Sequence, residues 1–214
     1  MRIDINSCDL DGLKPIKNSR HKGNFGGCYL FNGLAFKRLD MENDKLKKIP
    51  IEKRLEALSN LKVNGVSLPI DLVYCNNEFV GYTMPYYNGP TLSRILLEIK
   101  LGRRIITKED IFYFYFSIFF KIEKLSYSKI MVNDIKPDNI IYYNNEANLV
   151  DCDFYSVNAD ISKDELLSFN LKLLNEAFLK ILEDFFEYKE GIAYKDADLK
   201  SKDFINTCMS NLNL

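Results

Sequence analysis

The feature of this sequence that most constrains its fold is a change of pattern at Asn88-Gly89-Pro90. Before this break the chain consists mostly of short apolar runs separated by turn residues, a pattern typical of β-strands. After the break, longer segments carry apolar residues at helical spacing, which is typical of amphipathic helices. Strands in one part and helices in another predict an α+β fold. We therefore expect a β-rich part over residues 1–87 and a mainly helical part over residues 88–214.

Turn residues divide the first part into hairpins. Asn32-Gly33 separates the strand-like runs 26–31 and 34–39, and Asn-Gly is the strongest short hairpin signal because both turn residues take positive φ. Asn76-Asn77 separates two further runs, 70–75 and 78–85. The sequence therefore predicts two β-hairpins before the break.

Apolar periodicity and capping residues predict the helices. The segment 107–126 is apolar on nearly all sides, so we expect it at the centre of the helical part. Its most apolar stretch is about a dozen residues long, against the ~20 that a membrane-spanning helix needs, so no membrane span is expected. The expected helices cover residues 51–61, 92–100, 107–126, 162–187 and 198–212.

Composition excludes several classes of protein. The chain has 214 residues, enough for one well-buried core, and 29 basic against 30 acidic side chains give a net charge of −1. This balance excludes a strongly basic nucleic-acid-binding protein and a polybasic membrane module. Five scattered cysteines argue against a disulfide scaffold or a structural zinc site. We expect a cytoplasmic protein, with secretion as an effector by a signal-independent route as the alternative.

Two segments concentrate chemically active side chains. The first, Asn133 to Ile141 (N-D-I-K-P-D-N-I-I), places an acid, a base and an amide just before an apolar strand. The second places Asp151 and Asp153 directly after an apolar run, where carboxylates are costly unless they are paired or bind a metal. Carboxylate and amide oxygens suit Mg²⁺, whose coordination phosphate oxygens can complete. The two segments together predict a site for Mg²⁺ and a phosphorylated ligand.

A glycine-rich turn and a strand lysine lie earlier in the chain. The backbone N–H groups of Lys22 to Gly27 can form an anion cradle, and the ammonium of Lys37 on the next strand can reach phosphates as a point charge. Glu52 or Glu56 on the following helix can hold that ammonium as an ion pair. Taken singly, each feature has a plainer explanation: a hairpin turn, a surface lysine and solvated helix charges.

In their order and spacing these motifs resemble the eukaryotic-type Ser/Thr protein kinase fold, over about Gly23 to Asp153. The chain resembles in particular a compact bacterial kinase-like protein with a truncated C-lobe. The resemblance implies a bilobal domain: a small antiparallel β-sheet N-lobe with one helix over residues 1–87, and a reduced, mainly helical C-lobe over residues 88–214. It also implies ATP and Mg²⁺ as cofactors, with Mn²⁺ as the alternative metal, and a protein as the substrate.

The resemblance also assigns roles in catalysis and metal binding. The family's loop H-R-D-L-K-P-E-N is similar to Val132 to Asn139, so Asp134 is expected as the catalytic base and Lys136 as a γ-phosphate contact. Asn139 and Asp151 are expected as metal ligands, with Asp153 as the alternative to Asp151.

For ATP, the family's V-A-I-K strand is similar to Leu34 to Lys37, so Lys37 is expected to pair with the α/β-phosphates. Its expected helix partner is Glu56, with Glu52 as the alternative. The remaining expected nucleotide contacts lie in the glycine-rich loop, on the lysine strand and in the hinge, where Met84 is the gatekeeper: Gly23, Phe25, Gly26, Ala35, Met84, Tyr86 and Tyr87.

The chain departs from the family at several positions. His21 replaces the first glycine of the loop, Val132 and Asn133 replace the usual His-Arg, and no activation segment is visible after Asp153. Lys136 favours protein kinases, because small-molecule kinases usually carry His at that position. We expect an ATP- and Mg²⁺-dependent phosphotransferase acting on Ser or Thr of a protein; the alternatives are a nucleotide-binding pseudokinase or interaction module, and a small-molecule kinase.

Overall fold

The computed structural model describes residues 2–16, 26–104 and 106–212 and has an α+β fold. It divides into two compact units, one of Met1–Tyr86 with Asp151–Val157 and the other of Tyr87–Val150 with Asn158–Leu214. The expected division placed residues 151–157 with the helical part. They group with the first unit because Asp151 and Asp153 pair there with Lys37.

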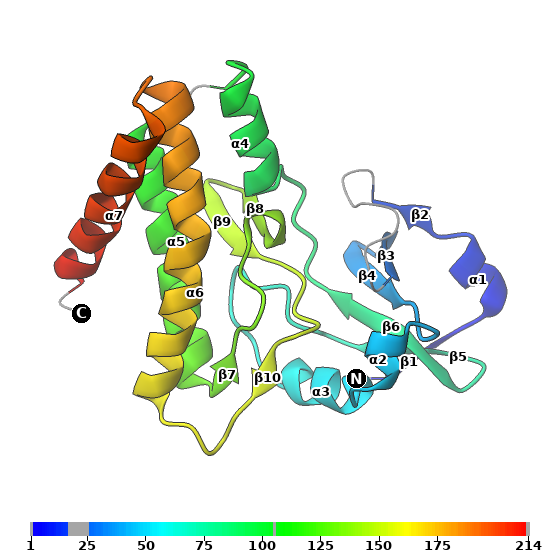
Figure 1. The fold of residues 1–214 in the computed structure, drawn as a ribbon. Coiled ribbons are helices and arrows are strands. Elements are labelled where there is room, and N and C mark those ends of the chain that lie inside the picture. Colours follow the sequence, from blue (N-terminus) through cyan, green and yellow to red (C-terminus); the bar gives the residue numbers. More distant parts are fainter. Residues whose placement is uncertain (1, 17–25, 105, 213–214) are drawn as a thin grey trace. The chain divides into compact units, whose positions relative to one another are not determined.

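The first unit contains a six-stranded sheet in the order β1-β5-β6-β4-β3-β2. The two predicted hairpins are confirmed, since β3 pairs with β4 and β5 with β6 in antiparallel register (Figure 1). Asn32, Asn76 and Asn77 take positive φ in the turns, as does Gly33. The strands are β1 (Arg2–Ile5), β2 (Lys14–Pro15), β3 (Gly26–Phe31), β4 (Leu34–Leu39), β5 (Leu72–Cys75) and β6 (Glu78–Met84).

Two features of this unit differ from the expected antiparallel sheet with one helix. The sheet is mixed, because β1 runs parallel to β5. Two short helices, α1 (Ser7–Asp11) and α2 (Asp44–Lys47), accompany the predicted one, α3 (Ile51–Ser59). The four residues of β1 alternate between polar and apolar side chains, too short a run to predict a strand without knowledge of its distant partner.

Strand alternation separates the sheet into two faces, one carrying Phe36 (the packed face) and the other carrying Lys37 (the lysine face). On β4, Phe36 joins the buried cluster with Leu10 and Val73. Its neighbours Ala35 and Lys37 therefore point to the opposite face, because successive strand residues alternate. On β6, Met84 lies opposite Ala35 and Tyr82 opposite Lys37, which brings these four side chains onto one face.

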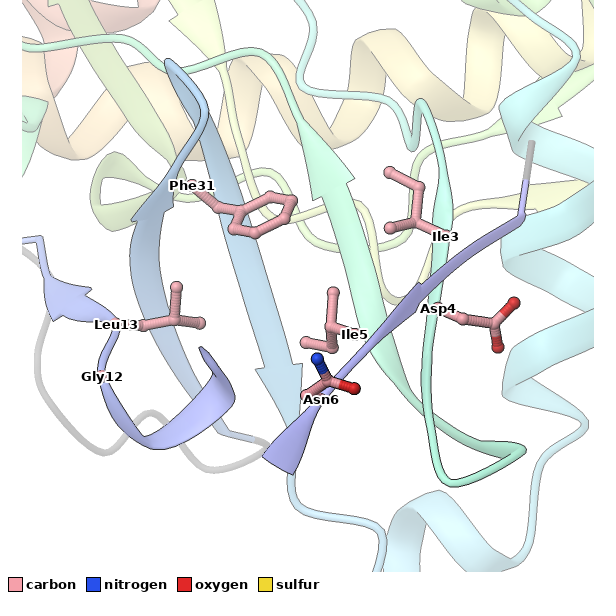
Figure 2. A pocket seen from close by; sticks show the side chains of 7 residues that line it. All are labelled: Ile3, Asp4, Ile5, Asn6, Gly12, Leu13 and Phe31. Atoms are coloured by element: carbon pink, nitrogen blue, oxygen red, sulfur yellow. The ribbon is translucent and has the colours of Figure 1, made fainter. Parts of the chain in front are cut away.

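A hollow of about 510 Å³ lies on the packed face. Figure 2 shows it among the side chains of Ile5, Leu13 and Phe31, all of which pack against the Phe36 cluster. It is therefore on the side of the sheet opposite to Lys37.

The second unit is mainly helical. Helices α5, α6 and α7 lie side by side, and a short hairpin of β8 and β9 turns at Asn144-Asn145, both at positive φ (Figure 1). Ser162 and Glu165 form a capping box at the start of α6, where the sequence predicts a helix from residue 162. The elements are α4 (Leu92–Lys100), α5 (Lys108–Tyr127), β7 (Ile130–Met131), η1 (Pro137–Asn139), β8 (Ile140–Tyr143), β9 (Glu146–Leu149), α6 (Lys163–Asp184), η2 (Phe185–Lys189) and α7 (Tyr194–Asn211); β10 (Ser156–Val157) belongs to the first unit.

Helix α5 is less completely buried than its apolar sequence predicts. Ile111, Tyr115 and Ile118 are fully buried, but Tyr113 is 68% and Phe120 50% exposed. At the end of α6 the chain passes into a π-helical turn, η2, and α7 begins four residues earlier than expected. Among the described residues, no helix is both long and apolar enough to cross a membrane.

Candidate active site

Lys37 occupies the centre of the first group of predicted site residues, in the first unit. Its side chain is buried, and its ammonium donates hydrogen bonds to the carboxylates of Asp151 and Asp153. Burial alone lowers the pKa of this ammonium, but Asp153 and Asp151 more than offset it, so the pKa lies above its usual value. The site therefore holds a permanent positive charge on the lysine face of the sheet.

Asp153 is the buried member of the acid pair. Its side chain is 0% exposed, and its second carboxylate oxygen accepts a hydrogen bond of 2.6 Å from the hydroxyl of Tyr82. Arg54 on α3 donates to its main-chain carbonyl at 3.4 Å. Burial raises the pKa of Asp153, while the adjacent Lys37 favours the carboxylate and offsets part of that effect. Asp153 is thus held on both oxygens inside the unit.

Asp151 differs from Asp153 in exposure and in backbone conformation. Its side chain is 38% exposed, so this carboxylate is partly accessible to solvent. Its φ is +65°, in the left-handed region, where the other non-glycine residues described are asparagines and Lys129. Such backbone strain in a non-glycine residue is frequent at functional sites. These observations favour Asp151 over Asp153 as a metal ligand.

The glycine-rich loop is described only at its end. Gly23 and Phe25 lie outside the described residues. Gly26 begins β3 with a φ of +139°, and a Cβ there would lie 1.8 Å from the carbonyl oxygen of Arg38. The close approach of β3 and β4 therefore requires glycine at position 26, whatever that residue also contributes to a ligand. Cys28 lies opposite Lys37 on the same face, and burial raises the pKa of its thiol to about 11.

The predicted adenine contacts divide between the units. Ala35 and Met84 are buried neighbours across β4 and β6, next to Lys37 along the same face. Tyr86 is half-buried and is the last residue of the first unit's segment Met1–Tyr86. Tyr87 belongs to the second unit, where its ring centroid lies 6.2 Å from that of Tyr143.

Neither predicted helix glutamate pairs with Lys37. Among the described residues, the ion pairs of Lys37 are with the two aspartates, while Glu56 is exposed and Glu52 accepts a hydrogen bond of 2.6 Å from Tyr74. The reason is that both glutamates lie on the exposed side of α3. Ile51, Leu55 and Leu58 are its buried positions, and Arg54 donates a hydrogen bond to the carbonyl of Asp153.

The second group of predicted residues forms the loop around η1, in the second unit. Lys136 donates to Oδ2 of Asp134 at 2.7 Å, and the amide nitrogen of Asn139 donates to the same oxygen at 2.9 Å. Within the described parts of the chain, the other oxygen, Oδ1 of Asp134, accepts no hydrogen bond. Asp134, Lys136 and Asn139 therefore lie together, with one carboxylate oxygen of Asp134 available to a hydroxyl group.

Asn139 is buried, and its fixed orientation suits a metal ligand. Its amide nitrogen also donates to the main-chain carbonyl of Asp134 at 3.1 Å, which leaves the amide oxygen for a cation. Val150, the residue before Asp151, donates its N–H to the carbonyl of Asn139 at 2.9 Å. The described residues contain no cluster of three or more His, Cys, Asp or Glu that could hold a metal. An amide oxygen alone is too small a donor set for Mg²⁺, so further carboxylate and phosphate oxygens would have to complete its coordination.

The sequence did not predict the role of Asn170. This residue of α6 is fully buried, accepts a hydrogen bond of 2.8 Å from the N–H of Val132 and donates at 3.0 Å to the carbonyl of Ile130. It thereby fixes the backbone that leads into the Asp134 loop. The sequence does contain an indication of this role, because Asn170 is a polar residue on the apolar stripe of α6. A polar side chain at a buried position is almost always hydrogen-bonded, so partners for it could have been expected.

We expect Asn170→Ala to lower the free energy of unfolding by roughly 2–4 kcal/mol, because a buried N–H and a buried carbonyl lose their partner. Urea unfolding followed by circular dichroism measures this change. The control is Lys172→Ala, an exposed residue of the same helix, which should change stability by less than about 0.5 kcal/mol. Equal stability of the two variants would contradict the assignment.

Comparison with known proteins indicates a distant kinase-like relationship. No protein-family model matches the chain. The chain is 30% identical over 172 residues to the serine/threonine-protein kinase PknD of Chlamydia pneumoniae, and the match covers 69% of this chain. The chain spans only 18% of the length of that relative.

Proposed function

We propose that this chain is an ATP- and Mg²⁺-dependent phosphotransferase that phosphorylates Ser or Thr of a protein. The observation that carries the proposal is the buried ammonium of Lys37 held by Asp151 and Asp153 on one face of the sheet. A permanent charge kept beside a partly exposed carboxylate suits a phosphate–metal ligand better than a role in stability, because buried ion pairs stabilise folds little.

In this proposal the first unit binds the nucleotide. Ala35 and Met84 offer an apolar surface to adenine, and Lys37, next along the same face, binds the α/β-phosphates. Asp151 of the same unit would supply a carboxylate oxygen to Mg²⁺. When bound, Mg²⁺ neutralises the phosphate charge.

The Asp134 loop performs the transfer. The acceptor hydroxyl places its proton on Oδ1 of Asp134 while its oxygen forms a bond to the γ-phosphorus and the bond to ADP breaks. Lys136, held beside Asp134 at 2.7 Å, stabilises the negative charge on the transferred phosphoryl group. Phosphoryl transfer depends mostly on such positioning and charge stabilisation, so a small set of residues is sufficient.

Two observations support a polypeptide as the acceptor. A hollow of about 550 Å³ in the second unit lies beside the Asp134 loop, lined by Leu97 of α4, Lys136 and Pro137 of the loop, and Glu176 and Lys180 of α6. Its mixture of apolar and charged side chains suits a segment of protein. The relative from Chlamydia pneumoniae is named a serine/threonine-protein kinase.

The proposal is tested by incubating the protein with γ-labelled ATP, Mg²⁺ and a cell lysate, beside the Asp134→Ala and Asp151→Ala variants. We expect label on Ser or Thr of a protein with the unchanged chain only. Label confined to the small-molecule fraction would indicate a small-molecule kinase. Absence of transfer, with a nucleotide-dependent rise in melting temperature, would indicate a nucleotide-binding pseudokinase.

A further inference from the structure

We propose that Asp153, itself held by Tyr82, is the positioning residue of Lys37 and takes the place of a glutamate on the helix. This inference rests on the proposed function, because it assigns how that site keeps Lys37 aimed at the phosphates. It gives Asp153 a role distinct from metal binding.

Both carboxylate oxygens of Asp153 are engaged. Oδ2 accepts from Lys37, and Oδ1 accepts from the hydroxyl of Tyr82 at 2.6 Å. Lys37 and Tyr82 are direct neighbours across β4 and β6, so the sheet register fixes both donors. The carboxylate therefore has one position, determined by two strands that pair along their length.

The turn that carries Asp153 is also fixed. Arg54 donates to the carbonyl of Asp153 at 3.4 Å, and the N–H of Tyr155 donates to the carbonyl of Cys152 at 2.9 Å. The thiol of Cys152 approaches the hydroxyl oxygen of Tyr82 at 3.8 Å. Main-chain and side-chain bonds thus hold the segment in the orientation that presents Asp153 to Lys37.

The two aspartates differ in exposure, and we assign them different roles on that basis. Asp151 is 38% exposed and can turn toward a metal, whereas Asp153 is 0% exposed and remains beside Lys37. If Asp151 binds Mg²⁺, the buried ammonium still needs a carboxylate, because an uncompensated buried charge is strongly destabilising. Asp153 supplies that counter-charge both with and without nucleotide.

This arrangement removes the control that a glutamate on α3 would have over the position of Lys37. In protein kinases the ion pair between the strand lysine and a helix glutamate must be in place, and helix position controls it. Here α3 directs Arg54 toward the Asp153 segment, while Glu52 and Glu56 lie on its exposed side. The placement of Lys37 is therefore independent of any carboxylate on α3.

The test is a double-mutant cycle on nucleotide affinity, measured with a fluorescent ATP analogue and Mg²⁺. We expect Asp153→Asn to weaken binding roughly 10- to 100-fold, as loss of a residue that orients a binding group typically does. In a Lys37→Met background the same change should alter affinity by less than about twofold, because Asp153 acts through Lys37. A merely structural role would produce the same loss in both backgrounds.

Two further variants complete the test, and the melting temperature of each is recorded. Tyr82→Phe removes one hydroxyl and should weaken binding by roughly three- to tenfold, the value of a single hydrogen bond. Glu56→Gln should change affinity by less than about twofold, in line with surface substitutions.

The inference would be overturned if the effects of Asp153→Asn and Lys37→Met on nucleotide affinity were additive, or if Glu56→Gln lost as much affinity as Asp153→Asn. Either result would leave the proposed function standing. Failure of the unchanged protein to bind nucleotide would overturn the proposed function, and this inference with it.

Discussion

Asp134→Asn is expected to lower the rate of phosphoryl transfer by roughly 10²- to 10⁴-fold, the usual contribution of general acid–base catalysis. Affinity for ATP should remain within about twofold of the unchanged protein, since the substituted amide keeps the shape and hydrogen-bonding capacity that Lys136 and Asn139 require. The reason for the slower transfer is that an amide accepts hydrogen bonds but cannot take up the proton of the acceptor hydroxyl. Single-turnover transfer and equilibrium nucleotide binding, measured on the same preparation, separate the two effects.

The matched control for this experiment is Asp160→Asn, an exposed aspartate outside the loop, which should leave both quantities unchanged. A variant at position 134 that transferred phosphate at the normal rate would show that Asp134 is not the base. Equal losses of rate and affinity would instead indicate damage to the loop.

Asp151→Asn is expected to abolish the Mg²⁺-dependent part of ATP binding and to lower transfer by at least about a thousandfold. A metal contributes several kcal/mol to charge stabilisation, and each 1.4 kcal/mol is a factor of ten in rate. The fold should be retained, because asparagine tolerates the left-handed φ of +65° at this position and Asp153 still pairs with Lys37. Titration of ATP with and without Mg²⁺ measures the first effect.

Asp151→Ala provides the comparison, since alanine loses the carboxylate and also strains the left-handed backbone. We expect it to match Asp151→Asn in activity but to melt at a lower temperature. Retention of Mg²⁺-dependent binding in Asp151→Asn would show that Asp151 is not the metal ligand. It would contradict the separate roles assigned to the two aspartates.

Local turn chemistry explains which elements the sequence predicts well. Asn32-Gly33 and Asn76-Asn77 demand positive φ, so the hairpins they close follow from the residues alone. Helix α4 has the bounds that the sequence predicts, and in the structure the side chain of Thr91 caps its first turn. Strand β1 was not predicted, because its pairing partner β5 is some 70 residues distant along the chain.

The candidate site shows the same division between local and distant information. Asp134, Lys136 and Asn139 lie within six residues, so their proximity is built into the local chain, and the structure brings them together. The carboxylate that meets Lys37 is more than a hundred residues away. Spacing alone favoured Glu56, but sheet register, helix face and burial determine which acid reaches the ammonium.

The roles of several buried polar residues could not be predicted from the sequence pattern. Asn170 and Tyr82 resemble ordinary members of an apolar helix and an apolar strand until their partners are known. Asp151 and Asp153 are nearly equivalent in sequence, and exposure and backbone conformation distinguish them only in the folded chain.

The most direct test of the central claim compares the fate of two labels on ATP. The protein, Mg²⁺ and a protein acceptor fraction are incubated with ATP labelled at the γ-phosphorus in one reaction and at the α-phosphorus in the other. A phosphotransferase that depends on Lys37, Asp134 and Asp151 transfers the γ label to Ser or Thr and leaves the α label on ADP. Transfer of the α label, or transfer of the γ label undiminished in Asp134→Asn, would contradict the account.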